Sequence, residues 1–382
     1  MNQSFALTCH RKLFQPLVPC ACILFFCIFA AAKQPTIITF DPPGSVYTSV
    51  QQVNLWGTIA GWYLDGNDIV HGFRRTLDGK ITLYDPPCAG KNVPGGAEFL
   101  SINASGTIGG TCLDSNFILH GFLVTAQGKY TLVDAPDAGT GVGQGTEVDN
   151  INDLGGASGV YINQGNNLQN TQVWHAYVRA ADGTITEYDA PGAGTGAGQG
   201  TQDCTNDCLN AEGTIAGSYI DATNARHGFI RSRHGDITEF DPPGSSYTSP
   251  TGIDAAADAV GFYVDSDGVN HGYIRDKQGR FTDINVPGAG TGAGQGTVVD
   301  SIAGGGITEG YYVDANNVYH GFSRTVSGEI TKIDIPGAGV GAGQGTVGIT
   351  NNAWGMVAGN YVDSNNVYHG FLWIPCDDDD HK

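Results

Sequence analysis

Hydrophobic and polar residues alternate along short segments of this chain, and glycine, proline, asparagine and aspartate separate the segments. In residues 148–191, for example, the alternation predicts strands at 148–152, 156–163, 173–180 and 184–190. Asp182-Gly183 supplies the positive φ of a tight hairpin turn, and Pro191 ends the last strand. No segment keeps a helical period of about 3.6 residues. The pattern predicts an all-β chain built from four-stranded antiparallel units of about 50 residues.

The same unit recurs along the whole chain, and three markers count its copies. One copy, residues 307–345, reads ITEGYYVDANNVYHGFSRTVSGEITKIDIPGAGVGAGQG. A His-Gly-Phe motif or a relative of it starts at His71, His120, His175, His227, His271, His320 and His369. A polar strand end precedes a proline at Asp41, Asp85, Asp134, Asp189, Asp241, Asn285 and Asp334. A less regular Ile-Asn marker lies at 102–103, 151–152, 209–210, 253–254, 302–303 and 349–350, with a weaker copy at Leu55-Trp56. The first two markers each count seven units, which predicts a propeller or another repeat array.

The two ends of the repeat favour a closed ring. The first segment after the leader, residues 36–41, reads as a fourth strand, and the last, residues 369–374, reads as a third strand. Pairing the two hides both sheet edges, which otherwise attract other strands. We therefore predict one seven-bladed β-propeller of four-stranded blades over residues 36–375, closed by the N-terminal strand.

The N-terminus and the charge indicate an exported protein. Residues 1–32 combine a basic start, an apolar stretch and Ala30-Ala31-Ala32, as a cleaved signal peptide does; the apolar stretch is shorter than the ~20 residues of a membrane anchor. Removing it leaves 16 basic and 38 acidic residues, a net charge of −22. This charge disfavours nucleic acid and anionic membranes, and is compatible with neutral glycans, cations or basic partners. We expect a secreted monomer, extracellular or periplasmic, with a disordered acidic tail at 376–382.

Five cysteines follow the signal peptide, and export permits disulfides. Cys204 and Cys208 are close enough to bridge within one loop, although free thiols or half of a zinc site are the alternatives. Cys88 and Cys112 are the candidates for a second bridge, which leaves Cys376 unpaired.

The repeated histidines are predicted to be structural. A catalytic or metal site uses one group of residues, whereas this histidine recurs once per unit and its copies would be spread around a ring. Each lies at a third strand and can hydrogen-bond to its own hairpin, six residues after an Asp in most units. Asp265-Ser266-Asp267-Gly268 starts like a calcium loop, but the later ligand positions do not follow, so an Asx turn is the simpler interpretation. We predict no metal and no catalytic set, with calcium as the one cofactor left open.

Four glycine-rich connectors, at 136–146, 191–201, 287–297 and 336–346, link successive units. No lysine or helix follows them as in a phosphate-binding loop. Connectors and Asp-to-His hairpins fall at one end of every unit, which we call the connector face, and we predict ligand binding there. The candidate residues are Asp65, Lys91, Asp114, Trp174, Asp221, Asp265, Asp314 and Asp363, and departures from the repeat, such as the insertion at 164–174, are the candidates for specificity.

With these motifs, the chain resembles the H-G-F or H-A-F type extracellular repeat proteins of bacteria, a propeller-like group without a defined chemistry. The resemblance covers residues 36–374 and implies a secreted propeller. The favoured function is a non-catalytic module that binds a glycan, a wall component or a protein. The alternatives are a polysaccharide hydrolase or lyase and a purely structural surface protein.

Overall fold

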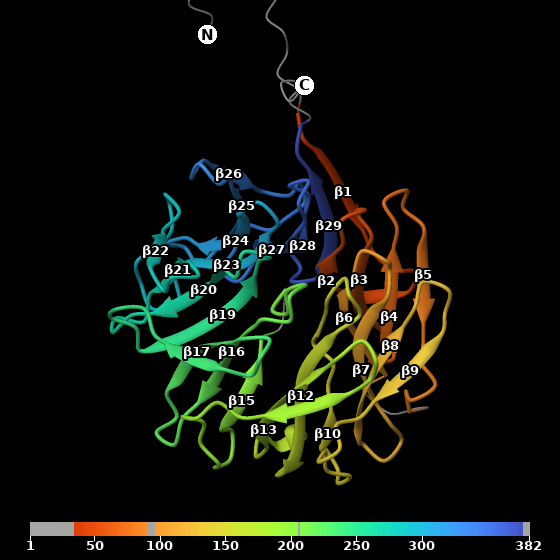
Figure 1. Ribbon diagram of the computed structural model, residues 1–382. Helices are drawn as coiled ribbons and strands as arrows, with labels where there is room; N and C mark the ends of the chain where they lie inside the picture. Colours follow the sequence, from red (N-terminus) through yellow and green to blue (C-terminus); the bar gives the residue numbers. More distant parts are fainter. Residues whose placement is uncertain (1–33, 91–95, 205–206, 377–382) are drawn as a thin grey trace, which may run out of the picture. The chain divides into compact units, whose positions relative to one another are not determined.

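The computed structural model describes residues 34–90, 96–204 and 207–376. The chain divides into two compact units, residues 1–34 and 35–382, and the description below concerns the second (Figure 1). The predicted signal peptide, Lys91 and the acidic tail beyond Cys376 lie outside the described residues. No helix within the described ranges is long and apolar enough to cross a membrane.

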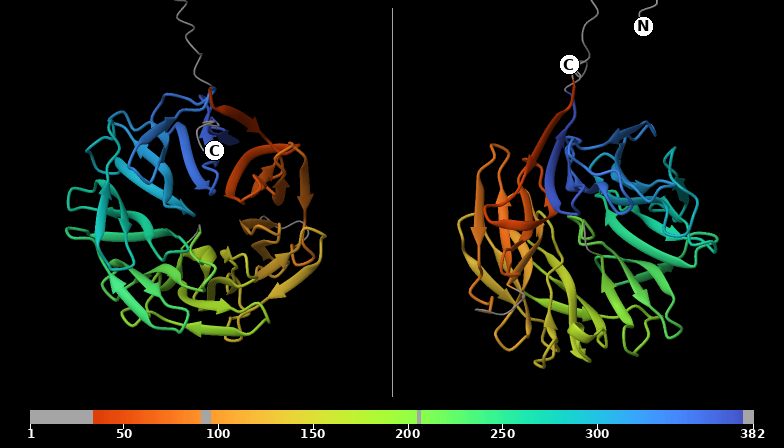
Figure 2. Two further views of the ribbon diagram at one scale, coloured as in Figure 1. Left: turned by 45° about the horizontal axis from the view of Figure 1, so that its top comes forward. Right: turned by 180° about the vertical axis from the view of Figure 1, so that it is seen from behind.

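The described part of the second unit is all-β apart from one 3₁₀ turn, η1 (Asn167–Gln169). Its strands form antiparallel sets that follow one another in chain order around a common centre (Figure 2). The first sets are β2 (Ser45–Val53), β3 (Ile59–Asp65), β4 (Val70–Arg75) and β5 (Ile81–Tyr84); β6 (Ala97–Ile102), β7 (Ile108–Leu113), β8 (Leu119–Val124) and β9 (Tyr130–Val133); and β10 (Gly145–Thr146) with β11 (Asn150–Ile151), β12 (Ala157–Gln164), β13 (Val173–Arg179) and β14 (Ile185–Tyr188).

The later sets continue the same order. They are β15 (Gly200–Asp203), β16 (Ile215–Ile220), β17 (Arg226–Arg231) and β18 (Ile237–Phe240); β19 (Tyr247–Ile253), β20 (Ala259–Val264), β21 (Asn270–Arg275) and β22 (Phe281–Ile284); β23 (Gly296–Ala303), β24 (Ile307–Val313), β25 (Tyr319–Arg324) and β26 (Ile330–Ile333); and β27 (Gly345–Asn351), β28 (Val357–Val362), β29 (Tyr368–Ile374) and β1 (Thr36–Phe40).

One predicted strand is wrong in its bounds. Residues 148–152 were expected to form a single strand, but the structure starts pairing earlier, at β10, and resumes at β11. Between them the strand bulges, and the carbonyl of Glu147 accepts a hydrogen bond from the hydroxyl of Tyr177 at 2.9 Å. The first strands of other sets bulge at the equivalent position, for example between Val50 and Gln52. A bulge bends the strand and re-aims its side chains.

The core is formed between sets by the aromatic residue of the His-Gly-Phe motif. These aromatics are fully buried: Phe73, Phe122, Tyr177, Phe229, Tyr273, Phe322 and Phe371. Phe371, for instance, belongs to a cluster with Ile333 and Ile335 of the preceding set, so this side chain packs between neighbouring sets. The glycine of the motif makes room for this packing, since a Cβ on Gly72 would lie 2.4 Å from the ring of Phe99.

The predicted pairing of the N-terminal strand with the last strand is confirmed. β1 runs antiparallel to β29, with Thr36 opposite Ile374 and Phe40 opposite Gly370. Two side-chain contacts fix this strand: Asp41 lies 2.8 Å from Nδ1 of His369, and the guanidinium of Arg75 lies 4.8 Å from the ring centroid of Phe40. The start of the repeat is therefore joined to its end.

Candidate functional site

The aspartates predicted to bind ligand on the connector face are engaged in their own hairpins. Oδ1 of Asp65 accepts the backbone N–H groups of Asn67 at 2.8 Å and Ile69 at 3.0 Å. These backbone hydrogen bonds lower the pKa of Asp65, because they stabilise the charged form. The same arrangement occurs at Asp114, Asp221, Asp265, Asp314 and Asp363. Each of these carboxylates thus already caps a turn.

The repeated histidines, which lie in the third strand, contact the end of the fourth strand in every set and the hairpin aspartate after the second strand in six sets. Nδ1 of each histidine lies 2.7 to 3.1 Å from the polar strand end fourteen residues later or, for His369, from Asp41. The opposite ring nitrogen, Nε2, faces the hairpin aspartate, within 3.0 Å at His271 and 3.5 to 3.8 Å in five other sets. Most of the rings also stack on a tyrosine of the second strand, as His71 does on Tyr63 with 5.1 Å between centroids. The histidine thus links strands within its set, and in every set except that of His271 its closest carboxylate is the strand-end aspartate rather than the hairpin one.

The remaining predicted positions are placed as follows. Trp174 is half-buried in β13, opposite Ile162. Its backbone N–H donates to the carbonyl of Gln199 at 3.0 Å. The structure pairs Cys88 with Cys112 and Cys204 with Cys208. Among the described residues, no group of three His, Cys, Asp or Glu side chains is arranged to hold a metal ion.

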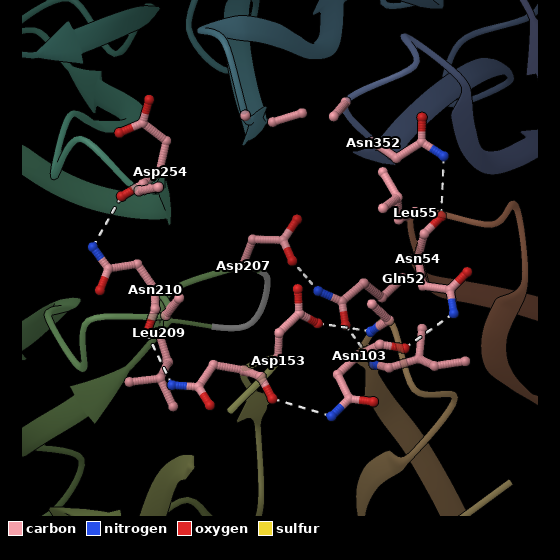
Figure 3. Close-up of a pocket in the computed structure, with 18 of the residues that line it drawn as sticks. Gln52, Asn54, Leu55, Asn103, Asp153, Asp207, Leu209, Asn210, Asp254 and Asn352 are labelled. Carbon is pink, nitrogen blue, oxygen red and sulfur yellow. Dashed lines mark hydrogen bonds between the residues drawn. The ribbon is translucent and has the colours of Figure 1, made fainter. Parts of the chain in front are cut away.

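A pocket of about 250 Å³ lies at the opposite end of the sets from the connectors (Figure 3). It is lined by the turns that join the first and second strands of each set. We call these the asparagine turns and define them by their first residues: Asn54, Asn103, Asn152, Asn210, Asp254, Ala303 and Asn352. Two of them correct the sequence assignment, because the first unit uses Asn54 rather than Leu55-Trp56 and the last uses Asn352 rather than Ile349-Thr350.

Each asparagine joins its turn to the next one. Nδ2 of Asn54 donates to the carbonyl of Asn103 at 3.0 Å, and the series continues to Asp254. Asn352 donates in the same way to the carbonyl of Asn54, so the last turn is linked to the first. Oδ1 of Asn54 accepts the N–H groups of Trp56 and Thr58 at 3.0 Å each. The amides are therefore engaged within the protein and link neighbouring turns at the rim of the pocket.

Asp207 enters the pocket from the disulfide loop. Its carboxylate accepts hydrogen bonds from Nε2 of Gln52 and, at 3.0 Å, from Oγ of Ser301, and its carbonyl accepts the N–H of Ile253 at 2.8 Å. Figure 3 shows the side chain pointing toward Gln52 in the middle of the pocket. Burial raises the pKa of Asp207 to about 6, and the nearby charge of Asp153 adds to the increase. Together with Asp254, these residues give the pocket an acidic lining.

Three of the asparagine turns carry a large, exposed apolar side chain next in sequence to a residue that lines the pocket. The third residue of an asparagine turn is Trp56, Leu154 or Trp354 in three of the turns, and these side chains are 62, 70 and 63% exposed. The indole of Trp56 is held by a hydrogen bond of 3.0 Å from Nε1 to the carbonyl of Ala104. The sequence analysis missed this surface, although the Trp-Gly pair at 56–57 and 354–355 in equivalent turns was a visible signal.

No family model and no curated protein matches the sequence. Solved structures do resemble it. A puromycin hydrolase matches with a TM-score of 0.51 and 12% identity over 87% of this chain, which spans only 53% of that enzyme. The BP39L lectin from Burkholderia pseudomallei matches with a TM-score of 0.49 and 12% identity over 87% of this chain and 99% of the lectin. A lectin from Aleuria aurantia, described as a six-bladed β-propeller, matches with 0.40 and 11% over 76% of this chain and 96% of the lectin. At such identities the likeness concerns the fold alone: the chain is all-β, and its structural neighbours include propeller lectins.

Proposed function

We propose that this protein is an exported, non-catalytic seven-bladed β-propeller that binds carbohydrate over its asparagine turns. Each blade is one strand set, and β1 completes the last blade. Three contacts between distant residues support closure: the β1–β29 ladder, the contact of His369 with Asp41 and the hydrogen bond from Asn352 to Asn54. The signal-like leader supports export.

The observation that carries the carbohydrate proposal is the exposure of Trp56, Trp354 and Leu154 in turns whose other residues line an acidic pocket. Apolar side chains of this size are normally buried, and an exposed group rimmed by polar residues marks an interaction site. Indole rings offer a flat apolar face to the C–H face of a sugar ring, and carboxylates accept hydrogen bonds from its hydroxyls. The connector face is less suited because its predicted carboxylates already cap turns.

The proposal is tested by binding of the purified mature chain to a panel of soluble polysaccharides, with tryptophan fluorescence as the readout. We expect a neutral glycan to bind, and Trp56→Ala and Trp354→Ala each to weaken it about tenfold, as loss of one stacked ring does. Val340→Ala is the matched control, because Val340 is 86% exposed but lies in a connector at the other end. If the glycan still binds with unchanged affinity after both tryptophan changes, the asparagine turns are not the binding site. Parallel measurements with calcium and with a chelator test whether calcium is needed for binding.

One observation favours hydrolysis as a second candidate. Burial raises the pKa of Asp207 to about 6, and Asp207 lies near a second carboxylate, that of Asp153. Glycosidases use a pair of carboxyl groups of which one has a raised pKa. Incubation of any bound polysaccharide followed by an assay for new reducing ends separates the candidates. Product formation that Asp207→Asn abolishes supports the enzyme, whereas stable binding without product supports the binding module.

A further inference from the structure

The third residue of each asparagine turn is exposed, but its character changes from one strand set to the next. We number the sets in chain order, from set 1 with β2 to set 7 with β29. From set 1 to set 7 the third residues are Trp56, Ser105, Leu154, Glu212, Ala256, Gly305 and Trp354. Sets 7 and 1 are neighbours, because Asn352 donates to the carbonyl of Asn54. The two tryptophans therefore belong to adjacent turns.

A second row of positions runs beside the first. In sets 1 to 6 it is the second residue of the turn between the third and fourth strands: Leu77, Ala126, Ala181, Arg233, Lys277 and Val326. In set 7 its place, directly after β29, is taken by Pro375. A Cβ added at Gly57 would lie 3.1 Å from Cδ1 of Leu77. One added at Gly306 would lie 3.6 Å from Cγ2 of Val326, so the two rows are in contact.

The two rows agree on where charge is placed. In set 4, Arg233 forms an ion pair with Glu212, with 3.5 Å between Nη1 and Oε2. In set 5, the backbone N–H of Lys277 donates to the carboxylate of Asp258 at 2.9 Å. In the other sets neither row carries a charged residue. Those uncharged sets follow one another in the order 6, 7, 1, 2, 3.

The uncharged sets carry large apolar side chains that are exposed. We call them the apolar run and define it by Val326, Trp354, Trp56, Leu77 and Leu154, which are 66, 63, 62, 41 and 70% exposed. A group of exposed apolar side chains bordered by polar residues marks an interaction site. Set 2 contributes only Ser105 and Ala126 to the two rows, so it is a gap in the run.

Contacts between neighbouring sets continue across this gap. The sulfur of Met356 in set 7 would lie 3.3 Å from a Cβ added at Gly57 in set 1. Nε1 of Trp56 donates to the carbonyl of Ala104 in set 2 at 3.0 Å. The N–H of Ala104 donates in turn to Oδ1 of Asp153 in set 3 at 2.7 Å. The indole of Trp56 is thus oriented toward set 2 before any ligand binds, which reduces the ordering cost of binding.

The extent of the apolar run decides which form of carbohydrate it suits. One sugar ring is similar in size to one indole, so it cannot contact side chains of sets 6, 7, 1 and 3 together. A chain of linked sugars can place units on several of them, and once one unit is bound the next binds intramolecularly at a high effective concentration. A single sugar unit would instead use the pocket of about 250 Å³ inside the turns.

We propose that the apolar run binds an extended oligosaccharide chain several units long, which follows sets 6, 7, 1, 2 and 3 and stops at the charged sets 4 and 5. This inference rests on the proposed function and names the form of its ligand, an internal stretch of a chain rather than a single terminal sugar. The chain is neutral, because neither row offers a charged side chain along this path.

The test compares mono-, di-, tetra- and hexasaccharides of the cello, laminari, manno, xylo and malto series on the purified mature chain by calorimetry. Where the polysaccharide panel identifies another glycan, its own fragments form the series. We expect the hexasaccharide to bind at least about tenfold more tightly than the monosaccharide. A monosaccharide that binds as tightly as its hexasaccharide overturns this inference and leaves the proposed function standing. If neither the fragments nor the polysaccharides bind, the proposed function fails and this inference fails with it.

Two substitutions that add an indole locate the chain. Ser105→Trp fills the gap in set 2, in a turn where Gly106 follows as Gly57 follows Trp56, and should tighten hexasaccharide binding about fivefold. Ala256→Trp adds the same ring in set 5 and should leave binding unchanged. An equal gain from both substitutions, or no gain from Ser105→Trp, overturns the proposed path. The comparison of chain lengths on the wild type decides the question even where a variant fails to fold.

Discussion

Replacing Asp207 by asparagine should stabilise the protein at neutral pH and leave it nearly unchanged at acid pH. The change removes one charge and keeps the shape. The carboxamide oxygen can still accept the hydrogen bond from Gln52, and its N–H group can donate to Oγ of Ser301, whose hydroxyl is also positioned to donate to Oδ1 of Asn351 at 3.0 Å. The substitution therefore isolates the electrostatic effect of a buried carboxylate.

The magnitude follows from the pKa. Burial raises the pKa of Asp207 from 3.8 to about 6, so the folded state binds the proton more tightly than the unfolded state. Unfolding free energy then falls as the pH rises from about 4 to above 6, and the loss approaches about 3 kcal/mol for this group at neutral pH. The Asp207→Asn variant has no carboxyl group at this position and therefore does not lose this unfolding free energy as the pH rises. For a domain of this size the gain corresponds to a melting temperature about 4 °C higher at pH 7.5.

Thermal melts followed by circular dichroism measure the melting temperatures of the wild type and of Asp207→Asn at pH 4 and at pH 7.5. Asp182→Asn is the control. Backbone and side-chain hydrogen bonds from Thr184 lower the pKa of Asp182, so its contribution to stability changes with pH in the opposite direction. The reasoning fails if Asp207→Asn lowers the melting temperature at pH 7.5, or if its effect is equal at the two pH values. The wild type should itself lose stability over this range, since burial raises the pKa of Glu147 to about 7 and of Asp203 to about 6.

Three further changes probe the frame of the fold. Asn103→Ala removes the hydrogen bond to the carbonyl of Asn152 and the side-chain oxygen that caps its own turn. It should lower the unfolding free energy by about 2 kcal/mol in urea titrations. Ser105→Ala, in the same turn, is the control and should lower it by less than half as much. Phe322→Ala, in the core between sets, should lower the unfolding free energy by about 3–5 kcal/mol in the same titrations, because Phe322 is completely buried. A decrease below about 1 kcal/mol would contradict this burial. The double change Cys88→Ser, Cys112→Ser should cost about 3–4 kcal/mol, because the bridge closes a loop with a sequence separation of 24, and an unchanged melt under reducing conditions would speak against the bridge.

The sequence predicted the elements of the fold well because they depend on local patterns. Alternation, turn residues and the recurring motif located most strands, and the unmatched segments at 36–41 and 369–374 predicted the pairing of β1 with β29. The bounds of the first strand of the third unit were wrong because pairing starts at Gly145 and is interrupted by a bulge before Asn150. Other first strands bulge at the equivalent position, and the period of the pattern does not reveal a bulge.

The candidate site was harder to predict because its contacts span much larger separations. Asp207 contacts Gln52, which is 155 residues away, and Asn352 contacts Asn54, which is 298 residues away. The sequence displayed the recurring asparagines and the strand-end aspartates, but only as markers of a repeat. Which carbonyl an Asn amide reaches depends on how neighbouring sets pack, and which carboxylate a histidine ring faces depends on how the strands pair within a set.

The departures from the repeat are where function is best sought, and the reason is the saturation of the repeated groups. Where a unit follows the pattern, its asparagine, histidine and aspartate hydrogen-bond to each other or to the backbone, so they have little capacity left for a ligand. Where the pattern breaks, other groups appear, such as exposed indoles at Trp56 and Trp354 and a carboxylate at Asp153. A repeat that satisfied every polar group in every unit would be stable and bind nothing, and this chain differs from such a repeat at a few positions of its asparagine turns.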